Sequence, residues 1–249
     1  MGKYVDFVED KYGLITLKRP EKRHAIHTQM AIELHSAVQQ AKRTSIPFLV
    51  ITSEGSNYFC AGGDLNTLHS GLPKSEVEEK LFFMNEVLYS IATFPVPVIC
   101  LLQGNALGGG CELATACDIR IAKSDTNFGF IQTKVGILPG WGGGALLYKK
   151  QLMDLAYHWL LTGAIHDTTY LYEKGWLQEV HQDKDWNIDQ LLAPYINKSI
   201  KQMVYLKAQY LRHIDKESLR KEMKQETAHC VNLWGSPSHH FYINEFKKE

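Results

Sequence analysis

Short apolar runs alternate with stretches in which apolar residues recur every three or four positions. The runs at residues 48–52 and 96–102 have the length and character of buried strands. Between such runs, Met30, Leu34 and Val38 repeat at the spacing of one helix face. Strands that alternate with helices predict an α/β fold.

The same reading predicts most elements along the chain. The polar stretch at residues 68–80, which contains Gly71 and Pro73, predicts a loop. Strands are expected at residues 4–8, 14–17, 48–52, 96–102 and 118–122 and after Gly175, and helices at 28–41, 82–94, 143–150 and 154–162.

The pattern changes near Asn187. Beyond this residue glycine nearly vanishes, and Lys, Gln, Leu and Tyr follow a helical repeat. We therefore divide the chain into a core at residues 1–186 and a C-terminal helical region at residues 187–249. The apolar stripe of that region is expected to pack either on the core or on a neighbouring subunit. Its members are Leu191, Leu192, Tyr195, Ile196, Val204, Leu206, Tyr210 and Leu211.

Charge and composition narrow the classes of function. The 27 Lys and Arg residues balance the 27 Asp and Glu residues, so no basic field favours nucleic acid or an acidic membrane. No apolar run reaches the length of a membrane span, and the first residues lack a signal-peptide pattern, which predicts a cytoplasmic protein. Five cysteines without a Cys-x-x-Cys pair indicate reduced thiols, and no metal site is expected.

The glycine-rich segment at residues 103–113 follows a predicted strand and leads into a predicted helix. Three glycines, residues 108–110, remove every side chain there, so a bound group can approach the backbone closely. The first amides of a helix have no internal partner and attract negative charge. Glu112 lies about one turn after Gly109, on the side of that amide. An amide aimed at developing negative charge, beside a carboxylate that can move a proton, indicates enolate chemistry.

Residues 59–65 form a second small-residue turn, in which Gly62 and Gly63 precede a helix-capping residue, Asp64. Taken with the first segment, this turn predicts two backbone amides that converge on one oxyanion. Either turn alone is equally consistent with close packing of a helix on a strand. Residues 128–144 are the third glycine-dense region.

Two other polar features are given structural roles. Asp118 and Arg120 are expected to form an ion pair. Cys111 stands beside Glu112, but a cysteine is more often a small buried residue than a nucleophile.

Together, the phrases at residues 59–65 (FCAGGDL), 103–113 (QGNALGGGCEL) and 136–143 (GILPGWGG) resemble the enoyl-CoA hydratase/isomerase family, the crotonases. The similarity covers essentially the whole chain. It implies a spiral of ββα units followed by a C-terminal helical region that forms homotrimers, often paired into hexamers.

The resemblance also implies a site. Family members stabilise the enolate of an acyl-CoA thioester with two backbone amides, which match Gly63 and Gly109, and Glu112 matches the first catalytic glutamate. One such donor contributes about 3–4 kcal/mol to barrier lowering. CoA is carried by the substrate, so no separate cofactor is expected. Trp141 is expected either in the acyl pocket or in the core. The substrate-binding and CoA-binding residues implied are Ala25, Ala61, Gly62, Asp64, Leu65, Gly108 and Trp141.

Two positions depart from the family pattern. The second catalytic glutamate is replaced by Gln132, whose amide cannot hold or release a proton near neutral pH. The usual asparagine of the early motif is His24, for which a packing or solvated role is expected.

Ethylmalonyl-CoA decarboxylase-like members resemble the chain further, at residues 64–66, 112–118, 139–143 and 233–237. A malonyl-type substrate brings its own carboxylate, which a second glutamate about 4 Å away would oppose by roughly 4 kcal/mol. The neutral Gln132 removes that repulsion. Loss of CO2 leaves an enolate for the two amides to hold, and Glu112 then delivers a proton to the α-carbon.

Two other readings stay open. One is an enoyl-CoA hydratase or isomerase that uses the single glutamate Glu112. The other is a protein of this fold that binds CoA or RNA without catalysis, against which the zero net charge and the retained Glu112 argue. Phe241, Lys247 and Lys248 either reach the CoA of a neighbouring subunit or form a solvated end. Chain length, stereochemistry and the choice between trimer and hexamer are left open.

Overall fold

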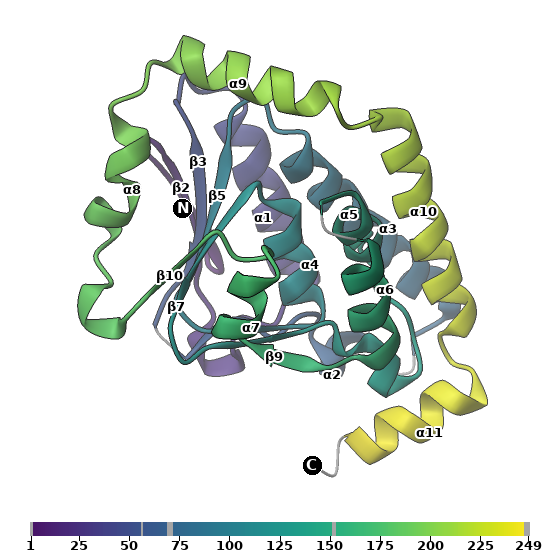
Figure 1. The fold of residues 1–249 in the computed structure, drawn as a ribbon. Helices are drawn as coiled ribbons and strands as arrows, with labels where there is room; N and C mark the ends of the chain where they lie inside the picture. Colours follow the sequence, from purple (N-terminus) through teal and green to yellow (C-terminus); the bar gives the residue numbers. More distant parts are fainter. Residues whose placement is uncertain (1, 56, 69–71, 151–152, 247–249) are drawn as a thin grey trace.

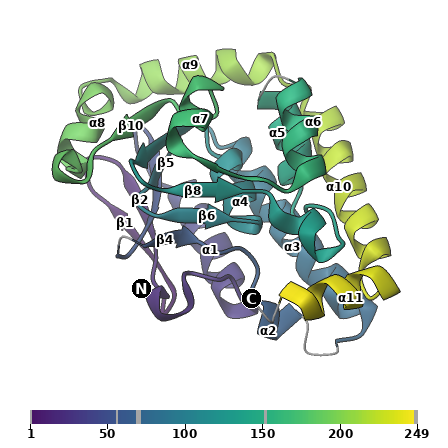
Figure 2. The same ribbon diagram turned by 60° about the horizontal axis from the view of Figure 1, so that its bottom comes forward.

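A computed structural model describes residues 2–55, 57–68, 72–150 and 153–246 (Figures 1 and 2). The strands are β1 (Val5–Glu9), β2 (Gly13–Leu17), β3 (Leu49–Ser53), β4 (Tyr58–Cys60), β5 (Val98–Leu102), β6 (Asn105–Leu107), β7 (Ile119–Lys123), β8 (Asn127–Gly129), β9 (Ile165–Asp167) and β10 (Glu179–His181). The helices are α1 (Thr28–Ala41), α2 (Leu65–Leu68), α3 (Lys74–Ala92), α4 (Gly109–Ala116), α5 (Gly143–Lys150), α6 (Met153–Thr162), α7 (Thr168–Glu173), α8 (Ile188–Ile196), α9 (Ile200–Arg212), α10 (Lys216–Leu233) and α11 (Pro237–Phe246). Short 3-10 helices occupy η1 (Pro20–Lys22), η2 (Ile131–Val135) and η3 (Asp183–Asp185).

A six-stranded sheet with the order β1-β2-β3-β5-β7-β10 forms the centre of the molecule. Only β1 and β2 pair antiparallel, as a hairpin, and the other neighbours are parallel. Every residue of β3 and β5 is buried, as expected for parallel strands that are covered on both faces. The predicted α/β class is confirmed.

A second, four-stranded sheet with the order β4-β6-β8-β9 lies beside the first (Figure 2). Three times, a strand of the large sheet is followed by a short strand of the small sheet and then by helix. These repeats are β3-β4 with α2 and α3, β5-β6 with α4, and β7-β8 with η2 and α5. This is the ββα spiral that the resemblance implies.

The glycines at residues 108–110 lie between a strand and a helix, as predicted, but the strand directly before them is the short β6, which the sequence did not suggest and which pairs with β4 and β8. One expectation about local structure is wrong. The predicted loop at residues 68–80 gives way to helix from Lys74 onward. Val77 and Leu81 bury one face of that helix, and the polar residues around them face outward.

The last four helices pack on the rest of the chain (Figure 1). Leu191, Leu192 and Met203 of α8 and α9 join Val50, Ile99 and their neighbours in an apolar cluster on one face of the large sheet. In contrast, Leu206 is 57% exposed and Tyr210 38% exposed, so the predicted stripe is divided between packing and surface. The domain boundary at residues 186 and 187 stays a prediction.

Helix α10 reaches the centre of the molecule. The Asn85 side-chain amide of α3 donates to the Met223 carbonyl of α10 over 2.9 Å and to the Thr227 hydroxyl over 2.8 Å. As a result, α10 is joined to the helices that surround the candidate site. Among the described helices, none combines the length and apolar character needed to cross a bilayer.

Candidate active site

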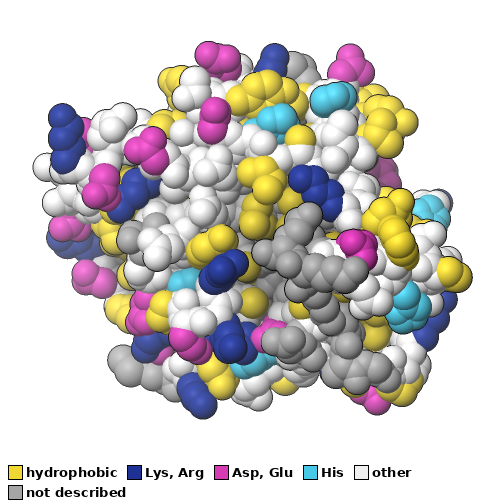
Figure 3. Space-filling model, turned by 90° about the horizontal axis from the view of Figure 1, so that it is seen from below, with side chains coloured by type: hydrophobic (Ala, Val, Ile, Leu, Met, Phe, Trp, Pro, Cys, Tyr) yellow, Lys and Arg dark blue, Asp and Glu magenta, His cyan; other side chains and the backbone are white. Residues whose placement is uncertain are grey.

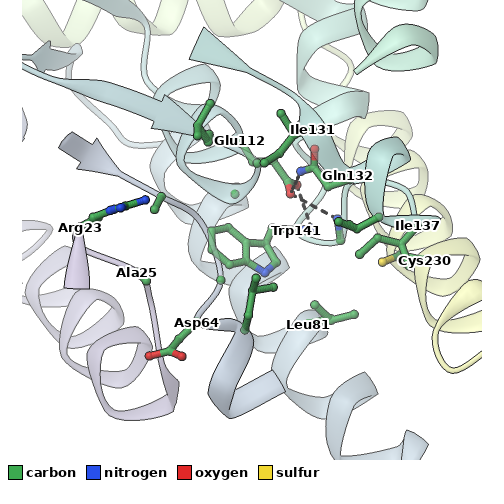
Figure 4. A pocket seen from close by; sticks show the side chains of 18 of the residues that line it. Arg23, Ala25, Asp64, Leu81, Glu112, Ile131, Gln132, Ile137, Trp141 and Cys230 are labelled. Atoms are coloured by element: carbon green, nitrogen blue, oxygen red, sulfur yellow. Dashed lines mark hydrogen bonds between the residues drawn. The ribbon is translucent and has the colours of Figure 1, made fainter. Parts of the chain in front are cut away.

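A cavity of about 440 Å³ opens where α4, η2, the start of α5 and α10 meet the turn after β4. One end is polar and includes Lys22, Arg23 and Asp64, whereas the opposite end includes Ile137 and Cys230 (Figure 4). Ten of the eleven predicted site residues line the cavity directly. They are Ala25, Ala61, Gly63, Asp64, Leu65, Gly108, Gly109 and Trp141, together with Glu112 and Gln132.

The start of α4 presents an amide to this cavity. The Gly108 N–H donates to the Gly129 carbonyl over 2.7 Å, and the positive φ of 52° at Gly108 turns the chain into the helix. Gly109 is the first helical residue, so its amide lacks a partner within the helix. It donates no hydrogen bond to any other described residue.

The turn after β4 presents a second amide. The Ile26 N–H donates to the Gly62 carbonyl over 2.8 Å, and the Asp64 N–H donates to the Ile26 carbonyl over 3.0 Å. These two bonds on either side fix the peptide of Gly63, whose own N–H has no acceptor within the described chain. Gly62 lies behind the cavity wall. A Cβ on Gly62 would approach the Gly109 nitrogen to 2.9 Å, so the two turns are in direct contact.

Glu112 lines the cavity, and its side chain is buried and held by four hydrogen bonds. Its Oε1 accepts from Gln132 Nε2 over 2.8 Å and from the Gly140 N–H over 3.3 Å. Its Oε2 accepts from the Trp141 and Gly143 N–H groups, both over 2.9 Å. Burial raises the pKa of Glu112, and these four donors oppose that rise.

Two neighbours fix the position of this carboxylate. A Cβ on Gly143 would overlap Cβ and Cγ of Glu112, so the start of α5 must be glycine for Glu112 to approach it. Gln132 is the only side chain among the four donors, and its own Oε1 is buried without a hydrogen-bond partner in the described structure. Of the four partners, Gln132 alone can rotate away without moving the backbone.

Trp141 is only 4% exposed, and its ring lies against Gly109. A Cβ on Gly109 would overlap three carbons of that ring. The indole lines the cavity and also belongs to the buried apolar cluster, so the expectation of a core position is confirmed, and a place in an acyl pocket stays a prediction.

The polar end of the cavity is held by an ion pair that the sequence did not suggest. Arg19 Nη1 lies 2.6 Å from Asp64 Oδ2 and 2.7 Å from the Ala25 carbonyl. Asp64 therefore forms an ion pair with Arg19 and also directly precedes α2. His24 is buried, accepts from the Arg19 N–H through Nδ1 and contacts the Glu54 carbonyl through Nε2. This geometry assigns His24 the packing role.

Several lining residues were missed because they come from elements far away in the sequence. Cys230 and Trp234 belong to the C-terminal part of the chain that was assigned to oligomerisation, and Leu81 lies directly after the predicted loop at residues 68–80. The signal available was the phrase at residues 233–237, which was used only for the resemblance. The complete set of missed lining residues is Glu21, Lys22, Arg23, Tyr58, Leu81, Leu107, Ile131, Val135, Ile137, Leu138, Gly140, Cys230 and Trp234.

A second carboxylate, Glu226 of α10, was also missed. It accepts over 3.1 and 2.8 Å from the Gly144 and Ala145 N–H groups, which directly follow the Gly143 N–H that donates to Glu112. Burial and the nearby Glu112 raise the pKa of Glu226. Glu226 therefore fixes the helix start on which Glu112 rests.

Other predicted features lie apart from the cavity. Phe241 is 62% exposed, and Lys247 and Lys248 fall outside the described residues. The Cys111 thiol is buried and donates to the Ala106 carbonyl over 3.0 Å, and burial raises its pKa, which argues against a nucleophile. No three His, Cys, Asp or Glu side chains of the described chain converge as a metal site. Basic and acidic side chains are interspersed on the face in Figure 3.

Comparisons with known proteins agree with this geometry. Residues 9–238 match the family model described as enoyl-CoA hydratase/isomerase. The chain is 35% identical over 162 residues to the mitochondrial methylglutaconyl-CoA hydratase of Mus musculus, a match that covers 64% of this chain and 51% of that protein. Over 137 residues it is 33% identical to the ethylmalonyl-CoA decarboxylase of Gallus gallus, covering 55% of this chain and 46% of that protein. The chain thus spans about half the length of these curated relatives.

The fold is similar to that of the enoyl-CoA hydratase from Bacillus halodurans, with a TM-score of 0.88. The two chains are 24% identical, and the match covers 98% of this chain and 100% of that one. At this identity the similarity shows the shared fold.

Proposed function

Because this chain belongs to the enoyl-CoA hydratase/isomerase family, we propose that it acts on a short acyl-CoA thioester through an enolate. The amides of Gly63 and Gly109 hold the enolate oxygen, and the reaction is decarboxylation of a methylmalonyl-type or ethylmalonyl-type CoA. One observation carries the proposal: two backbone amides that have no acceptor among the described residues line one cavity together with the buried carboxylate of Glu112.

The two ends of the cavity suit the two parts of such a substrate. Lys22 and Arg23 supply positive charge at the polar end, where the phosphates of CoA would be attracted. The acyl group would occupy the opposite end, between Ile137, Leu138 and Cys230. The thioester carbonyl then falls at the junction, next to Gly109.

The number of proton transfers that each reaction needs favours decarboxylation over hydration. Hydration requires one proton to leave water and another to reach the substrate, whereas decarboxylation requires only one proton to be delivered. The cavity centre offers one titratable side chain, Glu112, because Gln132 cannot exchange protons near neutral pH.

The apolar end adds a second argument. Apart from Glu112, none of the described residues lining that end is charged. A substrate carboxylate placed there loses hydration and gains no cation, which destabilises it relative to the charge-dispersed transition state. Loss of CO2 relieves that cost.

In the proposed reaction, the bond between the α-carbon and the carboxylate breaks and CO2 leaves. The electron pair of that bond forms the enolate, whose oxygen the Gly63 and Gly109 amides hold. Glu112, in its protonated form, then gives its proton to the α-carbon. While Glu112 carries that proton, Gln132 can rotate so that its unpartnered Oε1 accepts it. In the ionised state Gln132 Nε2 donates instead, as observed over 2.8 Å.

An enoyl-CoA hydratase or isomerase that uses Glu112 alone is the second candidate. It is favoured by the similarity to a relative named as a hydratase. It predicts addition of water to crotonyl-CoA and higher activity in Gln132→Glu, which restores the second carboxylate.

The test is mass spectrometry of CoA thioesters after incubation with methylmalonyl-CoA, ethylmalonyl-CoA and crotonyl-CoA in parallel. We expect loss of CO2 from a malonyl-type substrate and its disappearance in Glu112→Gln. Gln132→Glu should weaken binding of the malonyl-type substrate through charge repulsion. Gain of water on crotonyl-CoA with both malonyl-type substrates unchanged would overturn the decarboxylase assignment.

We also propose that the protein forms a homotrimer, or a hexamer made of two trimers, in the cytoplasm. Large apolar side chains remain exposed on α6, among them Met153, Tyr157 and Leu161, which supports an interface between copies. Five buried free cysteines support a reducing compartment. Light scattering coupled to gel filtration would give the number of subunits, and a monomer at micromolar concentration would refute the assembly.

A further inference from the structure

A second cavity of about 260 Å³ lies between α1, α2 and α3, behind the wall of the first. Most of its lining is apolar and includes Ile26, Ala31 and Met84, and the polar residues His27, Thr28 and Thr67 also line it. Glu79 and Ile32 are exposed and stand toward solvent. The cavity therefore combines an apolar interior with an open, polar mouth.

Two side chains, Leu81 and Trp141, line both cavities. They are 3% and 4% exposed, so they are packed from both sides. Trp141 rests against Gly109, and Leu81 rests against Gly140, where a Cβ would lie 3.0 Å from Leu81 Cδ2. The missing side chains of Gly109 and Gly140 leave room for both residues, which Figure 4 shows at the first cavity.

We infer that Trp141 and Leu81 form a partition that limits the acyl chain to a short length, and that the second cavity is a closed-off extension for a longer acyl chain. The inference rests on the proposed function, because it assumes that an acyl-CoA thioester occupies the first cavity. A thioester carbonyl held by Gly109 places the next acyl carbons against the indole. A chain that continues in this direction meets Leu81.

The mostly apolar lining of the second cavity fits an alkyl chain. Phe83 and Met84 add to its apolar wall, whereas of its charged residues Glu79 is exposed and Lys80 is half-buried. An alkyl chain passing the partition would exchange water for this surface, and each methylene so buried favours binding.

The experiment measures binding of saturated acyl-CoAs, which undergo neither decarboxylation nor hydration. Butyryl-, octanoyl- and lauroyl-CoA are titrated by calorimetry into the full chain and into Trp141→Ala, Leu81→Ala and Trp141→Leu. The readout is the ratio of the Kd for butyryl-CoA to the Kd for lauroyl-CoA. We expect the native chain to prefer butyryl-CoA and Trp141→Ala to shift the ratio at least about tenfold toward lauroyl-CoA.

Two further variants separate the partition from general loosening. Phe83→Ala enlarges only the second cavity and should leave the ratio unchanged while the partition is closed. Ala31→Phe in the Trp141→Ala background fills the second cavity and should restore the preference for butyryl-CoA. If Trp141→Ala does not fold, Trp141→Leu and Leu81→Ala give the same comparison.

The outcomes are distinct. Butyryl-CoA binding that persists with an unchanged chain-length ratio in every partition variant would overturn the inference and leave the proposed function standing. Failure of the native chain to bind any acyl-CoA would instead refute the proposed function. An equal shift in Phe83→Ala would show that loosening, and not the partition, controls chain length.

Discussion

The two ends of α4 differ in whether their terminal backbone groups form hydrogen bonds. At the N-terminal end, the Gly109 amide faces a cavity and donates to no other described residue. At the C-terminal end, the carbonyls accept hydrogen bonds from two buried basic side chains. Lys150 Nζ donates to the Ala116 and Cys117 carbonyls over 2.9 and 2.8 Å, and Arg120 Nη1 donates to the Cys117 carbonyl over 2.8 Å.

The C-terminal end of α4 holds the helix in place, whereas the N-terminal end lines the candidate site. Positively charged side chains at a helix C-terminus interact favourably with its partial negative charge, and here these side chains are buried. Lys207, only 2% exposed, adds a pair to Asp118 at 2.5 Å. The buried end fixes the helix, so the Gly109 amide at the other end stays in place without a partner of its own. Preorganised donors of this kind need no reorganisation when negative charge develops.

The largest effect is expected from Glu112→Gln at the N-terminal end. The variant removes the proposed proton donor, and general acid catalysis typically contributes about 10²–10⁴-fold to the rate. We expect kcat to fall by that factor in steady-state assays of the substrate identified by mass spectrometry. Glu222→Gln, at a half-exposed carboxylate that pairs with Lys149 on the surface, is the matched control. Turnover of Glu112→Gln within about threefold of the native value would remove Glu112 from the mechanism.

Gly109→Ala should have the next largest effect. A Cβ at this position would overlap the Trp141 ring, so the amide or the indole must move. Loss of one oxyanion donor typically lowers kcat by about 10²–10³-fold. The double variant Gly109→Ala with Trp141→Leu gives the methyl group room and should recover part of the loss. Equal kcat values for Gly109→Ala and the native chain would contradict the role of this amide.

These two ends also show how far the sequence could lead. Gly109 and Glu112 were found because they lie three residues apart in one glycine-rich segment, where local rules for helix starts apply. The α/β class followed from apolar runs in the same local way. The four hydrogen-bond donors to Glu112 could not be predicted, because three of them are backbone amides near residues 140–143, far from Glu112 in the sequence.

The contacts at the C-terminal end of α4 could not be predicted from local sequence patterns. Asp118 was expected to pair with Arg120, two positions away, but that expectation is wrong. Asp118 pairs with Lys207, 89 residues later in the chain, and Arg120 donates to the Trp176 carbonyl over 2.5 Å. Neither contact has a local signature, since both depend on where α9 and the segment before β10 pack. For the same reason, the contributions of Cys230 and Leu81 to the cavity were missed.

Lys207→Met tests the C-terminal end of α4 alone, and it should lower the stability of the protein without lowering kcat. Removing Lys207 leaves the Asp118 carboxylate without its nearest cation in a buried position. Breaking a buried pair in this way costs about 3 kcal/mol. Urea unfolding should show that loss, whereas kcat at a temperature where the variant is folded should stay within about twofold. The double variant with Asp118→Asn should be less destabilised than the single variant. A large fall in kcat in the folded variant would mean that the anchor shapes the site directly.

The smallest effect expected is a pH dependence at Lys150. Burial, with Arg120 and Lys207 nearby, lowers the pKa of Lys150 to about 7. The pKa of the unfolded chain is the ordinary lysine value of about 10.4, so between these two values the unfolded state binds more protons than the folded state. Stability should therefore rise with pH across this window and be lost as pH falls toward 7. Relative to Lys150→Met, the native free energy of unfolding should gain about 1–2 kcal/mol between pH 7 and pH 9.

Urea unfolding of both proteins at pH 6, 7, 8 and 9 measures this difference, and Lys149→Met provides the control. Lys149 is the sequence neighbour of Lys150, but its side chain is 33% exposed and pairs with Glu222 at the surface. Its substitution should change stability by the same small amount at every pH, because a surface pair contributes about 0–1 kcal/mol. A native-minus-Lys150→Met difference that stays constant from pH 7 to pH 9 would mean that Lys150 keeps its proton in the folded state. The two backbone carbonyls and Asp118 would then outweigh burial, and the anchored end of α4 would carry its full positive charge throughout this range.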